Sequence, residues 1–237
     1  MSLGFEIAGI EKCWAKILAV FKMVRVKICG ITNAEDAFAA IKLGADFLGF
    51  VLEIAGAERA VDRGEARALF EELRGNVQIV ALTDLVQAEK IAELCGFVGA
   101  DAVQLVKEMQ VEEILALRQL MPKLKIFKTV HVTGEAAISE AKRFGSLVDF
   151  IVLDSKSGRK LGGTGKKADW KICEKIVSEC GRHVFLAGGL TPENVAKAIE
   201  QVKPFGVDVS SGVKMQTNKR KIDLIKLKKF IEKAKKQ

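Results

Sequence analysis

Eight short apolar runs alternate with eight helical patterns along most of the 237-residue chain. The apolar runs lie at 25–28, 47–51, 77–82, 102–105, 125–129, 148–153, 183–187 and 206–209. Several have no polar interruption, as in Phe150-Ile151-Val152-Leu153, which is typical of strands in a parallel sheet that is buried on both faces. The helical patterns lie at 34–43, 64–73, 87–95, 111–120, 134–144, 169–180, 192–201 and 222–235. This alternation predicts an α/β fold, a single (β/α)8 TIM barrel.

Two of the expected helices have recognisable start signals. The segment Thr32-Asn33 precedes the acidic first turn of the 34–43 helix and offers a capping side chain. Thr191 followed by Pro192 predicts an N-cap and a first helical position for the helix at 192–201.

The first 22 residues stand outside the alternation. Large apolar side chains recur there near helical spacing, at Phe5, Ile10, Trp14, Ile17, Leu18 and Phe21. Charged residues within the same stretch argue against a secretory signal peptide. We therefore expect a helical N-terminal extension at 1–22 and the barrel domain at 23–237. Two interpretations of the extension stay open: a dispensable addition, or a helix that covers one end of the barrel or makes a dimer contact.

Charge is distributed unevenly. The segment 214–237 holds ten basic and two acidic residues, which accounts for the whole net charge of +8. The rest of the chain is neutral, which argues against a nucleic-acid groove across its body and leaves only a local basic helix. No apolar run approaches the length of a membrane-spanning helix, so no membrane association is expected.

The five cysteines and two histidines show no spacing typical of a metal site or of a disulfide framework. Reduced thiols in a cytoplasmic protein are the simple interpretation, with no metal bound.

The carboxyl ends of barrel strands are where sites gather in this fold. Glycine-rich segments follow three of the expected strands, and glycines let backbone N–H groups converge on an anion. The segments are Leu161-Gly162-Gly163-Thr164-Gly165, Gly188-Gly189 and Ser210-Ser211-Gly212. Because the last two follow strands seven and eight, they predict a phosphate site.

A thiol and a carboxyl group end two other strands. Cys29 precedes a glycine, where local N–H groups would favour its thiolate. Asp154 ends a very apolar strand, where desolvation would raise its pKa and keep it a usable acid. Acid–base chemistry is one interpretation of this pair. The alternatives are a small buried Cys29 and an Asp154 that caps the next loop.

These strand ends resemble those of the phosphoribosylanthranilate isomerase family. The resemblance runs in register from Val24 to about Lys235. It rests on Lys27-Ile28-Cys29-Gly30-Ile31-Thr32, Gly49-Phe50-Val51, Leu153-Asp154, Gly162-Gly163-Thr164-Gly165, Ala187-Gly188-Gly189-Leu190 and Asp208-Val209-Ser210-Ser211-Gly212-Val213.

The resemblance implies an isomerase of the aldose–ketose type that works in tryptophan biosynthesis without a cofactor. The reaction would be the Amadori rearrangement of N-(5-phosphoribosyl)anthranilate to 1-(2-carboxyphenylamino)-1-deoxyribulose 5-phosphate. Cys29 would be the general base and Asp154 the general acid, Arg59 would lie near the anthranilate carboxylate, and Asp208 would lie at the floor of the site. The phosphate would be held by Gly163, Gly188, Gly189, Ser210, Ser211 and Gly212.

The chain departs from the family pattern around the aryl half of the substrate. A Ser-x-Arg-Tyr-like segment is usual after strand two, and this chain has Ala57-Glu58-Arg59-Ala60. Val-Asn is usual after strand three, where Thr83-Asp84 stands, and the usual His-Gly after strand four is Val106-Lys107. After strand eight, the usual Glu-x-x-Pro-Gly is replaced by Lys214-Met215-Gln216-Thr217-Asn218.

Four functions are considered, and one of them, nucleic-acid binding through the basic segment 214–237, is disfavoured because the rest of the chain is neutral. The first is the isomerase itself, as a monomer or a homodimer that binds a small phosphosugar and no nucleic acid. The second is a related phosphosugar isomerase with a different aryl or amine half. The third is a noncatalytic phosphoribosyl-binding paralogue, which would have no need for both Cys29 and Asp154.

Overall fold

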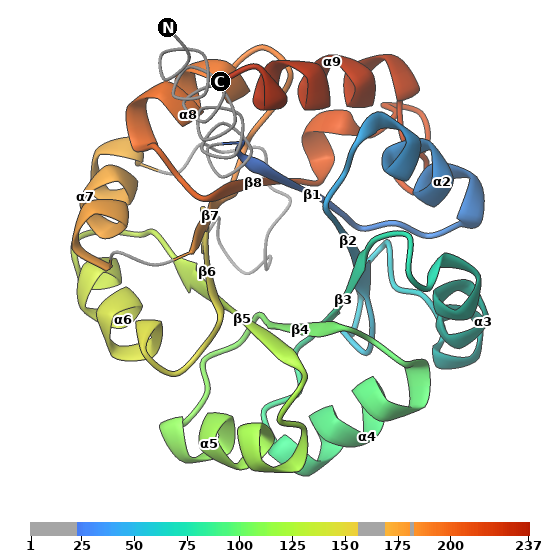
Figure 1. Cartoon of the computed structure of the whole chain (residues 1–237), viewed down its shortest axis with the longest axis vertical. Helices are drawn as coiled ribbons and strands as arrows, with labels where there is room; N and C mark the ends of the chain where they lie inside the picture. The colour runs from blue at the N-terminus through green and yellow to red at the C-terminus, as the bar shows by residue number, and fades with distance from the viewer. Residues whose placement is uncertain (1–22, 156–168, 181–182) are drawn as a thin grey trace, which may run out of the picture.

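The computed structural model describes residues 23–155, 169–180 and 183–237 and is a closed parallel barrel (Figure 1). Each strand pairs with the next one along the chain, and β1 closes the barrel against β8. The strands are β1 (Arg25–Cys29), β2 (Phe47–Val51), β3 (Gln78–Thr83), β4 (Ala102–Leu105), β5 (Lys125–His131), β6 (Phe150–Asp154), β7 (Val184–Leu186) and β8 (Gly206–Val209).

The described helices form an outer ring around these strands, and α9 closes the ring between α8 and α2 (Figure 1). They are α2 (Ala34–Leu43), α3 (Arg63–Leu73), α4 (Ala88–Val98), α5 (Val111–Leu120), α6 (Ala136–Gly145), α7 (Trp170–Cys180), α8 (Val195–Val202) and α9 (Leu224–Lys235). A short 3-10 turn, η1 (Ser211–Val213), follows β8. The predicted (β/α)8 barrel is confirmed. The extension expected at 1–22 lies outside the described residues. None of the helices in the described part of the chain has both the length and the hydropathy of a transmembrane segment.

Helix α2 begins as the sequence predicts, because the Asn33 side chain accepts a hydrogen bond from the Asp36 N–H (2.9 Å). Helix α8 begins three residues later than predicted. The Asn194 side chain accepts from the Thr191 N–H (2.8 Å), and the Thr191 hydroxyl accepts from the Glu193 N–H (3.2 Å). These bonds fold residues 191–194 into a separate turn ahead of the helix.

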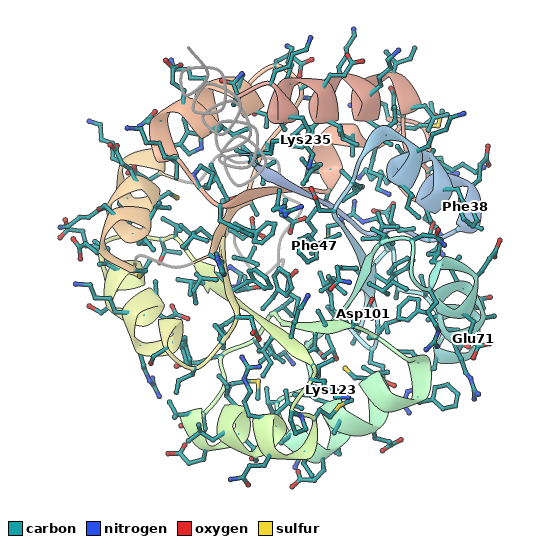
Figure 2. All side chains as sticks on the ribbon, viewed as in Figure 1. Phe38, Phe47, Glu71, Asp101, Lys123 and Lys235 are labelled. Carbon is teal, nitrogen blue, oxygen red and sulfur yellow. The ribbon has the colours of Figure 1, made fainter. Side chains whose placement is uncertain are left out.

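The apolar core has two parts. One lies between the strands and the helices, and the other fills the inside of the barrel. Phe47 points into the ring of strands in Figure 2, where its ring centroid lies 5.5 Å from those of Phe127 and Phe185. Phe150 joins this group, stacked on Phe127 at 4.3 Å. These rings fill the amino-terminal half of the barrel and leave its other end for polar side chains.

We expect Gly206→Ala to destabilise the barrel by about 1–3 kcal/mol, the usual cost of overpacking a core. A Cβ at Gly206 would lie 2.4 Å from the Phe185 ring and 2.9 Å from the Arg25 carbonyl oxygen, so the aromatic cluster would have to shift. Urea unfolding measures the loss. Gly96→Ala in α4 is the control, because a Cβ there meets nothing within 4 Å and alanine favours the helix. Equal stability of the Gly206 variant and the wild type would contradict this packing.

Candidate active site

A cavity of about 610 Å³ lies at the carboxyl ends of the strands. Most of the site residues expected from the sequence line it: Cys29, Arg59, Asp154, Gly188, Gly189, Asp208, Ser210 and Ser211. Gly163 lies outside the described residues. Gly212 is not in the lining, and a Cβ there would lie 2.0 Å from the Leu190 carbonyl oxygen, so this glycine lets η1 pack against the chain after β7.

Cys29 is the last residue of β1, and its side chain is buried at the edge of the cavity. Burial raises the pKa of its thiol above the usual value, and the charge of Asp208 acts in the same direction. The positive side chains of Lys27, Arg59 and Lys214 oppose this rise.

The sequence interpretation placed backbone N–H groups near this thiol. That expectation is wrong for the two amides that follow it, because the N–H groups of Gly30 and Ile31 both donate to the Gly49 carbonyl (2.8 and 3.0 Å). The positive charge near Cys29 comes from side chains instead.

A fully buried ion pair lies beneath Cys29. Lys27 Nζ donates to Asp208 Oδ2 at 2.9 Å, and neither side chain is more than 7% exposed. Burial acts to lower the pKa of Lys27, but the charges of Asp208 and Cys29 outweigh it and raise that pKa. A Cβ at Gly49 would lie 3.1 Å from Lys27 Nζ and 3.2 Å from Cys29 Sγ, so this glycine leaves room for both.

Asp154 ends β6 at the opposite wall of the cavity. Burial, followed by the charge of Asp208, raises its pKa to about 6, while the Ser155 N–H and Lys27 act to lower it. A carboxyl group with this pKa exchanges a proton near neutral pH. Gly188 has a φ of 79°, and a Cβ there would lie 2.6 Å from the Ser155 nitrogen and 2.9 Å from Asp154 Oδ1. Only glycine suits this position.

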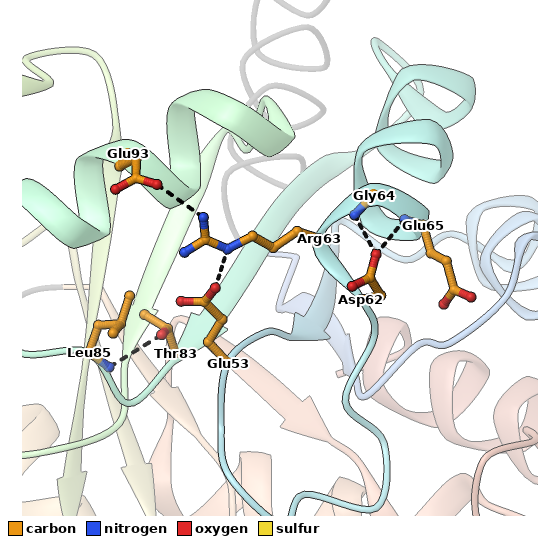
Figure 3. A network of polar contacts seen from close by, with 8 residues as sticks. All are labelled: Glu53, Asp62, Arg63, Gly64, Glu65, Thr83, Leu85 and Glu93. Atoms are coloured by element: carbon orange, nitrogen blue, oxygen red, sulfur yellow. Dashed lines mark hydrogen bonds and ion pairs between the residues drawn. The ribbon is translucent and has the colours of Figure 1, made fainter.

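Arg59 lies on the loop between β2 and α3, which is fixed at several points. Arg63 contacts both Glu53 and Glu93, and Asp62 caps the first turn of α3 (Figure 3). Arg220, from the loop before α9, donates to the carbonyl oxygens of Glu58 (2.9 Å) and Ala60 (3.2 Å). The residues on both sides of Arg59 are therefore held by a segment far away in the sequence.

The Arg59 side chain lies against Gly30, at the mouth of the cavity beside Cys29. A Cβ at Gly30 would lie 2.9 Å from Arg59 Nε and 3.3 Å from Ser210 Oγ. The φ of Gly30 is 73°, so both space and backbone conformation require glycine here.

The two glycines after β7 line the cavity in a left-handed backbone conformation. Gly188 and Gly189 have φ values of 79° and 67°, and the Asn194 side chain donates to the Gly189 carbonyl oxygen (2.9 Å). Ser210 and Ser211 approach from the end of β8. This combination of glycine backbone and hydroxyl groups suits an anion.

Several residues in or beneath the cavity wall were missed by the sequence analysis. Lys27 lies two residues before Cys29, so both side chains are on the same face of β1. A lysine in the middle of a buried strand was the signal in the sequence that could have indicated its place in the site. Strand β5 runs two residues beyond its predicted end, which brings His131 into the lining and into register with Asp154. Gln104 and Thr129 also line the cavity and are joined by a 3.0 Å hydrogen bond.

The described residues bring together no group of three or more His, Cys, Asp or Glu side chains that could hold a metal ion. Four of the cysteines, Cys29, Cys95, Cys173 and Cys180, are free thiols, and Cys13 lies outside the described part of the chain.

The closed barrel and the position of its cavity define the class of (β/α)8-barrel enzymes with a site at the carboxyl ends of the strands. Residues 26–233 match the family model of N-(5'-phosphoribosyl)anthranilate (PRA) isomerase, and the chain belongs to this family.

Its relatives match over nearly their whole length. The chain is 41% identical over 215 residues to N-(5'-phosphoribosyl)anthranilate isomerase 2 of Methanosarcina mazei, covering 90% of this chain and 94% of the relative. The structure of phosphoribosyl anthranilate isomerase from Thermotoga maritima superimposes with a TM-score of 0.78 at 36% identity, covering 91% of this chain and 100% of the other. A phosphoribosyl anthranilate isomerase in complex with reduced 1-(o-carboxyphenylamino)-1-deoxyribulose 5-phosphate gives a TM-score of 0.75 at 35% identity, with the same coverage.

Two of the departures from the family pattern contact one another. Asp84, after β3, and Lys107, after β4, form an ion pair at 2.9 Å. Val106 stands in the cavity wall where the family usually has histidine, and His131 lines the same cavity from β5. Val106 and His131 therefore belong to the cavity wall, whereas the Asp84–Lys107 pair lies outside the cavity lining.

Proposed function

We propose that this chain catalyses the Amadori rearrangement of N-(5'-phosphoribosyl)anthranilate to 1-(2-carboxyphenylamino)-1-deoxyribulose 5-phosphate in tryptophan biosynthesis. The observation that carries the proposal is the family match over the whole barrel, with a thiol and a carboxyl group on one cavity. The relative solved with a reduced form of this product supports the same substrate class.

The chemistry assigned to Asp154 is ring opening. Its carboxyl group donates a proton to the furanose ring oxygen as the bond from that oxygen to the anomeric carbon breaks, which leaves a protonated Schiff base to the anthranilate nitrogen. The raised pKa of Asp154 supports this role, because a carboxyl group near pH 6 still holds a proton in part of the molecules at neutral pH.

The chemistry assigned to Cys29 is proton abstraction. Its thiolate takes the proton from the sugar carbon next to the Schiff base, and the electrons of that C–H bond move into the Schiff base to form an enolamine. Tautomerisation of the enolamine gives the ketone. The neighbouring side chains of Lys27 and Arg59 favour the thiolate that this step needs.

The remaining residues would hold the two ends of the substrate. Arg59 binds the anthranilate carboxylate at the mouth of the cavity. Asp208 presents Oδ1, which has no hydrogen-bond partner among the described residues, toward a sugar hydroxyl while Oδ2 stays paired with Lys27. The phosphate binds backbone N–H groups of Gly163, Gly188, Gly189, Ser210, Ser211 and Gly212, together with the Ser211 hydroxyl group.

A related isomerase with a different aryl or amine half is the second candidate. The departure from the family pattern that lines the cavity, Val106 in place of the usual histidine, favours it. Turnover of two substrates separates the candidates. Loss of anthranilate fluorescence follows phosphoribosylanthranilate, and chromatography of the product follows phosphoribosylaniline. Purified protein should consume phosphoribosylanthranilate and turn over the matching phosphoribosylaniline, which lacks the carboxylate, with a higher KM. Faster turnover of the aniline compound would favour the second candidate.

The pH profile of kcat/KM should be bell-shaped, with its acid limb near pH 6. Catalysis needs a proton on Asp154, with its pKa of about 6, and none on Cys29, whose pKa lies above its usual value. Between the two pKa values the fraction of enzyme in that state is constant, and it falls below the lower value and above the higher one. Steady-state rates from pH 5 to 10 test this.

The substrate phosphate also titrates near pH 6. The pH dependence of product-analogue binding therefore serves as the control for the acid limb. A kcat/KM that stays constant from pH 5 to 7 would contradict the assignment.

The chain acts in the cytoplasm as a monomer or a homodimer in this proposal. A Thermotoga maritima relative is described as dimeric, which supports the second state. Sedimentation of the purified protein distinguishes the two.

A further inference from the structure

Lys214 is a buried lysine at the edge of the cavity to which the reaction above gives no part. It follows η1, is 3% exposed and lines the cavity together with Cys29 and Arg59. Its backbone is held between Ser211, whose carbonyl oxygen accepts from the Lys214 N–H (3.2 Å), and an antiparallel bridge to Ile222. These contacts fix the position of the Lys214 backbone, from which the side chain extends.

The ammonium group of Lys214 is anchored beside the thiol. Its Nζ donates to the carbonyl oxygen of Gly30, the residue directly after Cys29, at 2.7 Å. Ser210 Oγ donates to the carbonyl oxygen of Cys29 itself at 3.0 Å. Ser210 and Lys214, both in the segment that follows β8, therefore hold the end of β1 through its carbonyl groups, and Lys214 carries a positive charge.

Burial and the surrounding charges set the pKa of Lys214. Burial lowers its pKa to about 8, and the positive charges of Arg59 and Arg220 act in the same direction. Asp36 on α2 and Cys29 oppose them. Asp36 is itself buried and already accepts hydrogen bonds from the Asn33 side chain (3.1 Å) and the Ile222 N–H (3.0 Å).

The charged groups that face Cys29 come from several elements. Lys27 on β1, Arg59 on the β2–α3 loop and Lys214 after η1 are positive, and Asp208 on β8 is negative. Lys27 is bound to Asp208, and Arg59 lies at the mouth of the cavity, where the proposed function assigns it to the substrate. Lys214 differs from both because its anchor is a neutral carbonyl group.

We propose that Lys214 is a positioning residue for the base: its ammonium group, fixed on the Gly30 carbonyl, stabilises the thiolate form of Cys29. The charge acts through Cys29 and not through the substrate. This inference rests on the proposed role of Cys29 for its effect on turnover, whereas its effect on the thiol is independent of any substrate. The family pattern has glutamate at this position, so the charge is a property of this chain.

The thiol pKa is measured on the protein without substrate. The rate of Cys29 alkylation by iodoacetamide is followed against pH, and mass spectrometry of the Cys29 peptide separates it from the other thiols. The Cys29 pKa is taken from the alkylation rates between pH 6 and 7.5, where Lys214, with its own pKa of about 8, still holds its proton. Lys214→Met should raise this Cys29 pKa by about one pH unit or more, the size of effect that a nearby opposite charge has. Lys214→Arg should leave it close to the wild-type value, and Lys214→Glu should raise it further than methionine does.

Lys228→Met on the exposed face of α9 is the control and should leave the alkylation profile unchanged. Circular dichroism and Tm show whether each variant is folded. Lys214→Gln, which removes the charge but can still donate a hydrogen bond to the Gly30 carbonyl, replaces the methionine variant if that variant does not fold. At pH values below the thiol pKa, each unit of increase leaves about tenfold less thiolate. Lys214→Met should accordingly lower kcat about tenfold for phosphoribosylanthranilate, with little change in KM.

Two results would overturn the inference. One is an unchanged Cys29 pKa in folded Lys214→Met. The other is a raised KM with an unchanged thiol pKa, which would make Lys214 a substrate-binding residue. A raised thiol pKa without any loss of turnover would support the inference and contradict the role of Cys29 as the base.

Discussion

We expect Asp154→Asn to lower kcat by about 10²- to 10⁴-fold, the usual contribution of a general acid. Asparagine keeps the shape of the side chain but has no proton to give to the ring oxygen, so the substrate remains cyclic. The variant should still bind reduced 1-(2-carboxyphenylamino)-1-deoxyribulose 5-phosphate, because the phosphate and carboxylate contacts do not use Asp154. Steady-state kinetics and equilibrium titration with this analogue measure the two quantities separately.

Asp62→Asn is the matched control for that variant. It makes the same chemical change at the N-cap of α3, where asparagine caps as well as aspartate does, and should leave kcat unchanged. A loss of less than tenfold in Asp154→Asn would mean that another group, or water, supplies the proton.

Cys29→Ser should cause a loss of similar size, about 10²- to 10⁴-fold in kcat. Serine is close to cysteine in volume, but its hydroxyl group is far too weak an acid to give an anionic base near neutral pH. The buried surroundings that already raise the pKa of the thiol would disfavour an alkoxide still more. Turnover and binding of the reduced product analogue are measured on the same preparation.

Cys180→Ser supplies the control, since this free thiol at the end of α7 lies away from the cavity lining. Full activity of Cys29→Ser would show that Cys29 only fills space at the end of β1. An inactive variant that binds the analogue normally would place the thiol in the chemistry.

The barrel could be predicted because the hydrophobic pattern of each strand and each helix lies within its own short segment of the sequence. Each apolar strand and each amphipathic helix carries its own period, and three strands, including β2 and β4, have the predicted bounds. Cys29 and Asp154 were found by the same logic, since the end of a buried strand can be located from the sequence. The end of β5 was not located in this way: the strand continues for two residues beyond its predicted end, so His131 fell outside the predicted strand.

The electrostatics of the site could not be predicted in the same way. Lys27 is tolerated inside the barrel only because Asp208 reaches it from a strand 181 residues away, and Lys214 reaches Gly30 across 184 residues. The hydrophobic periodicity of the sequence near each residue does not indicate either contact. The sequence therefore assigned the charge near the thiol to backbone amides, which the structure uses to join β1 to β2.

The most direct test is the loss of phosphoribosylanthranilate fluorescence with purified wild-type protein and with the double variant Cys29→Ala/Asp154→Asn. The wild type should consume the substrate at micromolar concentrations or below and form 1-(2-carboxyphenylamino)-1-deoxyribulose 5-phosphate. The double variant should bind the reduced product analogue and leave the fluorescence unchanged over the same time. A wild-type protein that binds the substrate without consuming it, or a double variant that consumes it at the wild-type rate, would contradict isomerisation by this pair of residues.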